Sequence, residues 1–265
     1  MAASIRKRVL VLYLAVFVLV CLVCASARAH YMWIYVMDYA PDPGQKISLS
    51  LGWGHLFPGT DVMKNEDLEE IYAIGPSGKK LKVTPEPEQG KFRIEAPGDL
   101  PGAYLIIAKR KGGYKTKTTE GYKSLPKKDL KNVISSAYRE MNAKAIVIVG
   151  RSGKDTHLQE EIGFPLEIVP TEIPTDMREG DSLSVKVLFR GKPHRGFVHA
   201  TYTGFTADED TFAYAAKTNK DGIAKIKLLK SGIWMVKAEH TTPPSDPELC
   251  DEHLFVSTLT FEVKR

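Results

Sequence analysis

Residues 182–202 read SLSVKVLFRGKPHRGFVHATY, and this stretch decides the fold class. Apolar and polar residues alternate over Ser182–Phe189 and again over Gly196–Tyr202, with Arg190-Gly191-Lys192-Pro193 between them. Alternation with a period of two is typical of strands that bury one face, and Gly and Pro mark a turn. The stretch therefore predicts two strands joined by a turn.

The same pattern continues along the C-terminal half. Five further segments have the length and alternation of short strands: Leu166–Val169, Phe212–Lys217, Ile223–Leu229, Gly232–His240 and Leu254–Val263. Seven short strands in about 100 residues are typical of an immunoglobulin-like sandwich, although the cysteine pair of antibody domains is absent. We therefore predict that residues 164–265 form an immunoglobulin-like β-sandwich domain.

The N-terminal half is also rich in strand patterns, so the predicted fold class is mainly all-β, with two β-sandwich domains. The expected strands are 30–37, 47–51, Glu70–Ile74, Leu81–Thr84, Lys91–Glu95, Ala103–Arg110 and Lys144–Val149. One helix is expected at Lys127–Met141, because Val133, Ala137 and Met141 share one face at helical spacing. We predict that residues 30–155 form the first domain, which carries this helix, and that the boundary lies at about residues 151–164.

Residues 1–29 have the three regions of a secretory signal peptide. Arg6, Lys7 and Arg8 precede an apolar run at Val9–Cys24, and Ala27-Arg28-Ala29 supplies small residues before the cleavage point. We expect cleavage after Ala29 and export, with a bacterial periplasm as the compartment. An uncleaved signal anchor is the alternative.

Cleavage changes the charge and the cysteine content. Removing 29 of 265 residues leaves 236 and takes away four basic residues and no acidic ones, so the formal charge falls from +5 to +1. Such a charge gives no support for nucleic-acid binding. Cys250 is the one cysteine left, so no disulfide is expected within the mature chain, and the oligomeric state is left open.

His30 would become the N-terminal residue after cleavage. Its freed α-amine and its imidazole Nδ1 would then close a chelate ring on a metal ion, and the amine loses its proton near pH 8. The alternative is that the signal peptide simply ends there.

His55 is the second metal-ligand candidate, in the sequence Gly52-Trp53-Gly54-His55 directly after a predicted strand. The glycines favour a tight turn that leaves the imidazole accessible. If this strand pairs with the first, His30 and His55 supply three nitrogens, a set that suits Cu(II) or Ni(II). The alternative is an exposed turn histidine.

Three further residues are weaker candidates. His240 ends a predicted strand, and a backbone carbonyl is an equally good partner for its ring. Cys250 and His253 lie within Cys250-Asp251-Glu252-His253, where thiolate and imidazole favour Zn, Ni or Cu, although the same residues also make an ordinary acidic loop.

No glycine-rich phosphate loop, Gly-x-Ser-x-Gly elbow or His-Glu-x-x-His motif occurs, so we do not expect an enzyme. Lysines and arginines are frequent from Lys109 to Lys131. This basic region is either a solvated surface or a surface for anionic lipid headgroups or an acidic partner.

Several motifs resemble a family of exported domains of unknown function that is grouped with periplasmic components of cobalt and nickel ABC transport systems (NikM-like). The resemblance covers nearly the whole mature chain and rests on Ala29-His30-Tyr31-Met32-Trp33-Ile34, Gly54-His55, Gly113-Tyr114-Lys115-Thr116-Lys117-Thr118, Gly163-Phe164-Pro165-Leu166-Glu167-Ile168-Val169-Pro170 and Thr218-Asn219-Lys220-Asp221-Gly222. His55 is followed by Leu56, where the family pattern has proline.

The resemblance implies that the protein handles a divalent metal. The leading hypothesis is a non-enzymatic periplasmic protein that binds nickel or cobalt and presents it to a membrane ABC or energy-coupling-factor transporter. The alternatives are a copper-dependent oxidase that uses His30 and His55, and a structural or carbohydrate-binding sandwich without metal.

Overall fold

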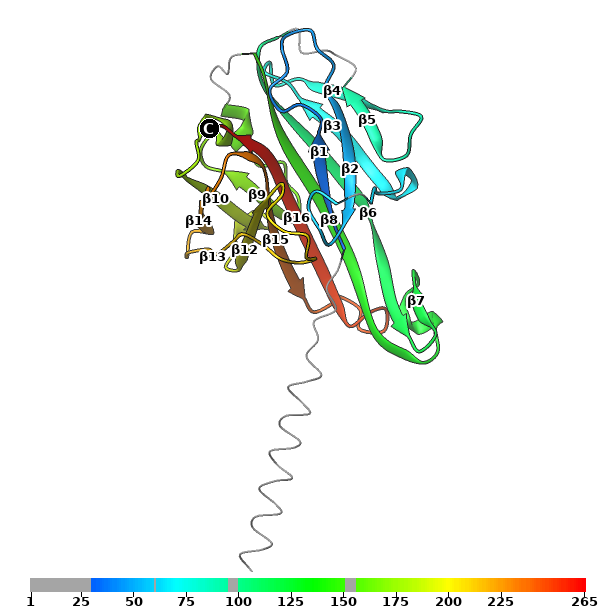
Figure 1. Cartoon of the computed structure of the whole chain (residues 1–265). Coiled ribbons are helices and arrows are strands. Elements are labelled where there is room, and N and C mark those ends of the chain that lie inside the picture. The colour runs from blue at the N-terminus through cyan, green and yellow to red at the C-terminus, as the bar shows by residue number, and fades with distance from the viewer. Residues whose placement is uncertain (1–29, 60, 95–99, 151–155) are drawn as a thin grey trace, which may run out of the picture. The chain divides into compact units, whose positions relative to one another are not determined.

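Strands make up almost all of the regular structure in the computed structural model, which describes residues 30–59, 61–94, 100–150 and 156–265 (Figure 1). The signal-peptide prediction at residues 1–29 lies outside the described residues. In the N-terminal half the strands are β1 (Tyr31–Val36), β2 (Ser48–Gly54), β3 (Leu68–Ile74), β4 (Lys80–Pro85), β5 (Lys91–Ile94), β6 (Gly102–Thr118), β7 (Gly121–Lys123) and β8 (Val133–Val149).

The C-terminal half continues with short strands joined by turns. These are β9 (Leu166–Pro170), β10 (Ser182–Phe189), β11 (Lys192–Pro193), β12 (Phe197–Tyr202), β13 (Tyr214–Lys217), β14 (Ile223–Lys227), β15 (Gly232–Thr242) and β16 (Glu252–Val263). Four short 3-10 helices complete the described elements: η1 (Asn65–Asp67), η2 (Lys127–Asp129), η3 (Thr156–Gln159) and η4 (Pro174–Asp176).

Two sheets organise the strands. The larger has the order β1-β2-β5-β4-β3-β6-β8-β16-β15-β12-β13, with β7 paired to β6. The smaller has the order β11-β10-β14, with β9 paired to β10. Almost all pairs are antiparallel, and the β8–β16 pair is parallel. The larger sheet therefore joins strands from both halves of the chain.

The long strands β6 and β8 face two hydrophobic cores at once. On β6, Leu105 and Ile107 belong to one core, whereas Tyr104, Ile106 and Ala108 belong to the other. Successive side chains of a strand point to opposite faces, so a continuous apolar run marks a strand that is covered on both sides. The two cores consequently share these central strands.

The first core lies between the central strands and the layer that contains β1 and β2. Leu49 and Leu51 pack there against Ala145 and Val147 of β8. Strand β1 is also fixed by side chains, because Thr258 and Thr260 of β16 donate hydrogen bonds of 2.7 Å to the carbonyl oxygens of Met32 and Ile34.

The second core lies between the larger sheet and the smaller one. The C-terminal half contributes seven strands to this sandwich, β9, β10 and β12–β16, and Trp234 and Phe261 are buried inside it beside residues of β6 and β8. These are the seven strands that the alternating pattern predicts. The predicted all-β fold class and its immunoglobulin-like C-terminal sandwich are confirmed.

A buried ion pair joins the central strand β8 to β9. Lys144 Nζ lies 2.8 Å from Glu167 Oε1, and both side chains are almost completely inaccessible. Glu167 also accepts hydrogen bonds from the backbone N–H groups of Ile162 and Gly163. Burial lowers the pKa of Lys144, and the carboxylate of Glu167 opposes that shift. The extra hydrogen bonds on Glu167 are what a buried charge requires.

The predicted helix at Lys127–Met141 is wrong. Only Lys127–Asp129 is helical, as the 3-10 helix η2, and β8 begins at Val133. A spacing of four residues fits one face of a strand as well as one face of a helix, because four is a multiple of two. Pairing with β6 on one side and β16 on the other decides between the two.

Residues Tyr31–Arg265 form one compact unit. The division into domains at 30–155 and 164–265 stays a prediction. The structure contains two hydrophobic cores, and the larger sheet contributes strands to both of them. The helices among the described residues are all too short to cross a membrane.

Candidate functional site

The two leading histidine candidates are adjacent in sequence to the same end of the β1–β2 pair: His30 comes just before β1, and His55 comes just after β2. Tyr31 is opposite Gly54, and this is the last pair of the antiparallel register. His55 directly follows Gly54, and the Tyr31 hydroxyl donates a 2.8 Å hydrogen bond to the His55 carbonyl oxygen. His30 directly precedes Tyr31 and is exposed. The pairing of the first two strands, which a combined ligand set of His30 and His55 would require, is therefore present.

Asp210 holds the imidazole of His55. Its Oδ2 lies 3.0 Å from His55 Nδ1, and the two side chains are 11% and 14% exposed. The backbone N–H of Asp210 donates a 2.9 Å hydrogen bond to the His55 carbonyl oxygen. The nearby carboxylate favours a proton on Nδ1, which would leave Nε2 with the lone pair that binds metals.

Aromatic rings and a lysine surround this pair. Tyr31 lies 6.3 Å from Phe212 between ring centroids, and Phe212 lies 5.0 Å from His199. Lys237 Nζ lies 4.6 Å from the centre of the Tyr31 ring. Burial raises the pKa of Tyr31, and the charges of Asp210 and Glu209 raise it further, so its hydroxyl stays a donor.

His240 lies in a different environment. Its ring centroid is 4.3 Å from that of His194 and 4.5 Å from that of Phe189. Burial lowers the pKa of His240, and the charge of Arg190 lowers it further. The structure therefore pairs His240 with a histidine that no sequence motif marks.

Cys250 and His253 line one pocket of about 380 Å³. Its lining residues are Tyr114, Tyr138, Pro244, Ser245, Asp246, Leu249, Cys250 and His253. His253 Nε2 lies 2.8 Å from Glu140 Oε1, and Cys250 is a free, buried thiol. These two candidates are brought together, whereas His55 and His240 have different neighbours.

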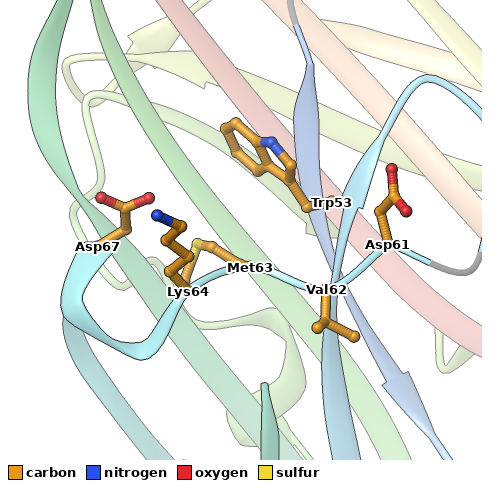
Figure 2. A pocket seen from close by; sticks show the side chains of 6 residues that line it. All are labelled: Trp53, Asp61, Val62, Met63, Lys64 and Asp67. Carbon is orange, nitrogen blue, oxygen red and sulfur yellow. The ribbon is translucent and has the colours of Figure 1, made fainter. Parts of the chain in front are cut away.

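A second pocket, of about 290 Å³, lies around the end of β2 (Figure 2). It is lined by Trp53, Asp61, Val62, Met63, Lys64 and Asp67. The guanidinium of Arg110 lies 5.1 Å from the centre of the Trp53 ring, within the range of a cation–π contact.

Within the described residues, no group of three or more His, Cys, Asp or Glu side chains has the arrangement of a metal site. The ligand set expected at His30 differs from such a group, because it includes a backbone amine. Sequence reasoning missed Asp210 because this residue is distant in the chain and no local motif marks it.

Fold and site together define an all-β protein with an immunoglobulin-like sandwich and a histidine–carboxylate pair at the end of its first strand pair. Residues 27–242 match the model of the family described as "Domain of unknown function (DUF4198)", and the chain belongs to this family. None of the curated proteins matches the chain. The family description assigns no function, so the association with nickel and cobalt stays a prediction.

Solved structures resemble the chain only distantly. The D0-D1 domain of intimin is 12% identical with a TM-score of 0.23, over 88% of this chain and 97% of that one. The fibronectin(III)-like modules of Clostridium thermocellum CbhA are 10% identical with a TM-score of 0.23, over 87% and 94%. A DUF4785 family protein from Legionella pneumophila is 10% identical with a TM-score of 0.24, over 91% and 48%. These low scores support no statement about function.

Proposed function

We propose that this protein is a non-enzymatic, exported accessory protein that binds nickel or cobalt through His30 and His55 and presents the metal to a membrane transporter. The metal is cargo in this proposal. The observation that carries it is the 3.0 Å approach of Asp210 Oδ2 to His55 Nδ1. A carboxylate on the second ring nitrogen is the usual way in which proteins orient a metal-binding histidine.

The strand register supports the participation of His30. Tyr31 and Gly54 are opposite each other, His30 directly precedes Tyr31, and His55 directly follows Gly54. Cleavage after Ala29 would add a free amine at this end of the pair. Amine, Nδ1 of His30 and Nε2 of His55 would then supply three nitrogens, and such a set suits Ni(II), Co(II) and Cu(II).

Copper is the alternative cargo or cofactor, and the copper oxidase hypothesis uses the same nitrogens. His240, Cys250 and His253 stay predictions as further ligands. The pocket shared by Cys250 and His253 offers thiol and imidazole groups and is the better of the two secondary positions.

Calorimetric titration of the exported protein with Ni(II), Co(II), Cu(II) and Zn(II) tests the proposal, after mass spectrometry has verified that the chain begins at His30. We expect D210N to weaken binding by about 10- to 100-fold, because it removes the carboxylate that orients His55. A chain with one additional residue before His30 should lose the chelate.

D221N is the matched control, because Asp221 is an exposed carboxylate at a turn and lines neither pocket, and the affinity of this variant should equal that of the wild type. Equal metal affinity in wild type, D210N and the extended chain would refute the proposal. Oxidation of a substrate by the copper-loaded protein would instead favour the oxidase hypothesis.

A further inference from the structure

Three basic side chains gather on one face of the long β6–β8 hairpin. Lys115 is opposite Ala137, Arg139 is opposite Gly113, and Arg110 is opposite Met141. Ala137, Arg139 and Met141 are two residues apart on β8, so their side chains point to the same face. Lys115 is therefore the diagonal cross-strand neighbour of Arg139, at about 7 Å between α-carbons. Arg110 lies on the other side of Gly113, beyond an irregularity in the β6–β8 register.

This face continues the one that forms the first core, where Ala143 and Ala145 of β8 pack beneath the β1–β2 layer. The hairpin extends well past the ends of β1 and β2, and β7 lies at its tip (Figure 1). The glycine opposite Arg139 keeps the face open, because a Cβ atom added at Gly113 would meet no atom within 4 Å.

The three cations have few anionic partners. Arg110 has a carboxylate oxygen of Asp67 at 3.7 Å and the Trp53 ring at 5.1 Å. Lys115 has the Tyr122 ring at 5.0 Å. The Nε atoms of Arg110 and Arg139 are buried and donate no hydrogen bond to any described residue. Buried donors without acceptors are costly, and an ion or a water molecule is one of the partners that can satisfy them.

Burial and mutual repulsion act on this cluster. Burial lowers the pKa of Lys115, and the charges of Arg139 and Arg110 lower it further. Burial also lowers the pKa of Arg139, while the nearby carboxylates of Glu252 and Glu239 partly offset it. The three like charges repel one another, and the neighbouring carboxylates offset this repulsion only in part, so a bound anion would stabilise the cluster.

We propose that Arg110, Lys115 and Arg139 bind a phosphate group. Guanidinium and ammonium donors match the oxygens of a phosphate, and three positive charges suit a dianion better than a single carboxylate. The phosphate belongs either to a soluble phosphate compound or to the headgroup of an anionic phospholipid. This site shares no residue with the proposed metal site, so either proposal can fail alone.

Thermal unfolding of the purified protein with inorganic phosphate, against chloride at equal ionic strength, tests the site. We expect phosphate to raise the melting temperature of the wild type. R139Q should melt higher than the wild type without phosphate, because it relieves the repulsion, and should bind phosphate about tenfold more weakly.

K123A is the matched control. Lys123 is exposed on the same hairpin, but it pairs with Thr116, whose side chain points to the opposite face from Lys115. The control should respond to phosphate as the wild type does. Equal responses of R139Q and K123A, or no response of the wild type, would overturn the proposal.

Flotation with phosphatidylglycerol vesicles, against phosphatidylcholine vesicles, identifies the source of the phosphate. Binding to phosphatidylglycerol that R139Q loses and K123A keeps assigns the site to lipid headgroups. A phosphate response without vesicle binding assigns it to a soluble ligand.

Discussion

At the scale of single residues, Gly52 shows how a missing side chain can position a large one. A Cβ atom at Gly52 would lie 2.1 Å from Cε2 of Trp33, whose ring is almost completely buried. Gly52 belongs to β2, so the expectation of a tight turn at this glycine is wrong. Its role is to leave room for the indole of the neighbouring strand.

We predict that Gly52→Ala destabilises the protein by about 1–3 kcal/mol, because the added methyl overpacks the indole of Trp33. Urea unfolding monitored by circular dichroism measures the change. Gly113→Ala is the control, since a Cβ there would meet nothing within 4 Å, and its stability should stay near that of the wild type. Equal effects of the two substitutions would contradict the packing explanation.

The residues of the candidate site differ in how far the sequence could reveal them. His55 could be selected because it follows a recognisable strand and a glycine motif. Asp210 and His194 could not, since each meets its histidine partner only after strands distant in sequence have paired. A contact of this kind leaves no local pattern.

At the scale of elements, the alternating strands of the C-terminal half could be predicted almost residue by residue. Strands β10, β12 and β14 bury mainly one face, and the period of two is then visible in the sequence. Strand β8 differs, because Ala143–Val149 is buried on both faces and Val133–Met141 fits either period. Its neighbours β6 and β16 determine its conformation, and their pairing is a property of the fold.

A pair of histidines, His194 after β11 and His240 on β15, should make the stability of the protein depend on pH. The imidazole rings of His194 and His240 lie 4.3 Å apart, with Phe189 and Arg190 beside them. Burial lowers the pKa of both histidines below 6.5. The charge of His240 lowers the pKa of His194 further, and the charge of Arg190 lowers the pKa of His240 further. The unfolded chain therefore binds more protons, and the free energy of unfolding falls as the pH drops through the folded-state values.

His240→Gln should make this fall shallower between about pH 5 and pH 7, because it removes one titrating group and one charge next to His194. Urea unfolding at several pH values measures the slope. Lys220→Gln, at an exposed turn of the same half, should keep the slope of the wild type. A slope in His240→Gln as steep as that of the wild type would exclude the histidine pair as its cause.

At the scale of the whole molecule, the shared strands β6 and β8 couple two cores that the sequence divides between two predicted domains. Leu51 belongs to the first core and Leu259 to the second, and both side chains are fully buried. Alternate side chains of β6 and β8 face the two cores. Unfolding of either core would therefore expose one face of both strands and weaken the other core. We therefore expect one cooperative unfolding transition.

Leu51→Ala and Leu259→Ala should each lower the stability of this single transition by about 2–5 kcal/mol, since each leaves a cavity in a buried core. Scanning calorimetry measures it, and equal calorimetric and van't Hoff enthalpies would show that the cores unfold together. Leu229→Ala is the control, because this leucine is 47% exposed and its loss should have little effect. Two transitions, each shifted by only one of the core substitutions, would instead establish residues 30–155 and 164–265 as independent folding units. The shared strands would then transmit no stability from one core to the other.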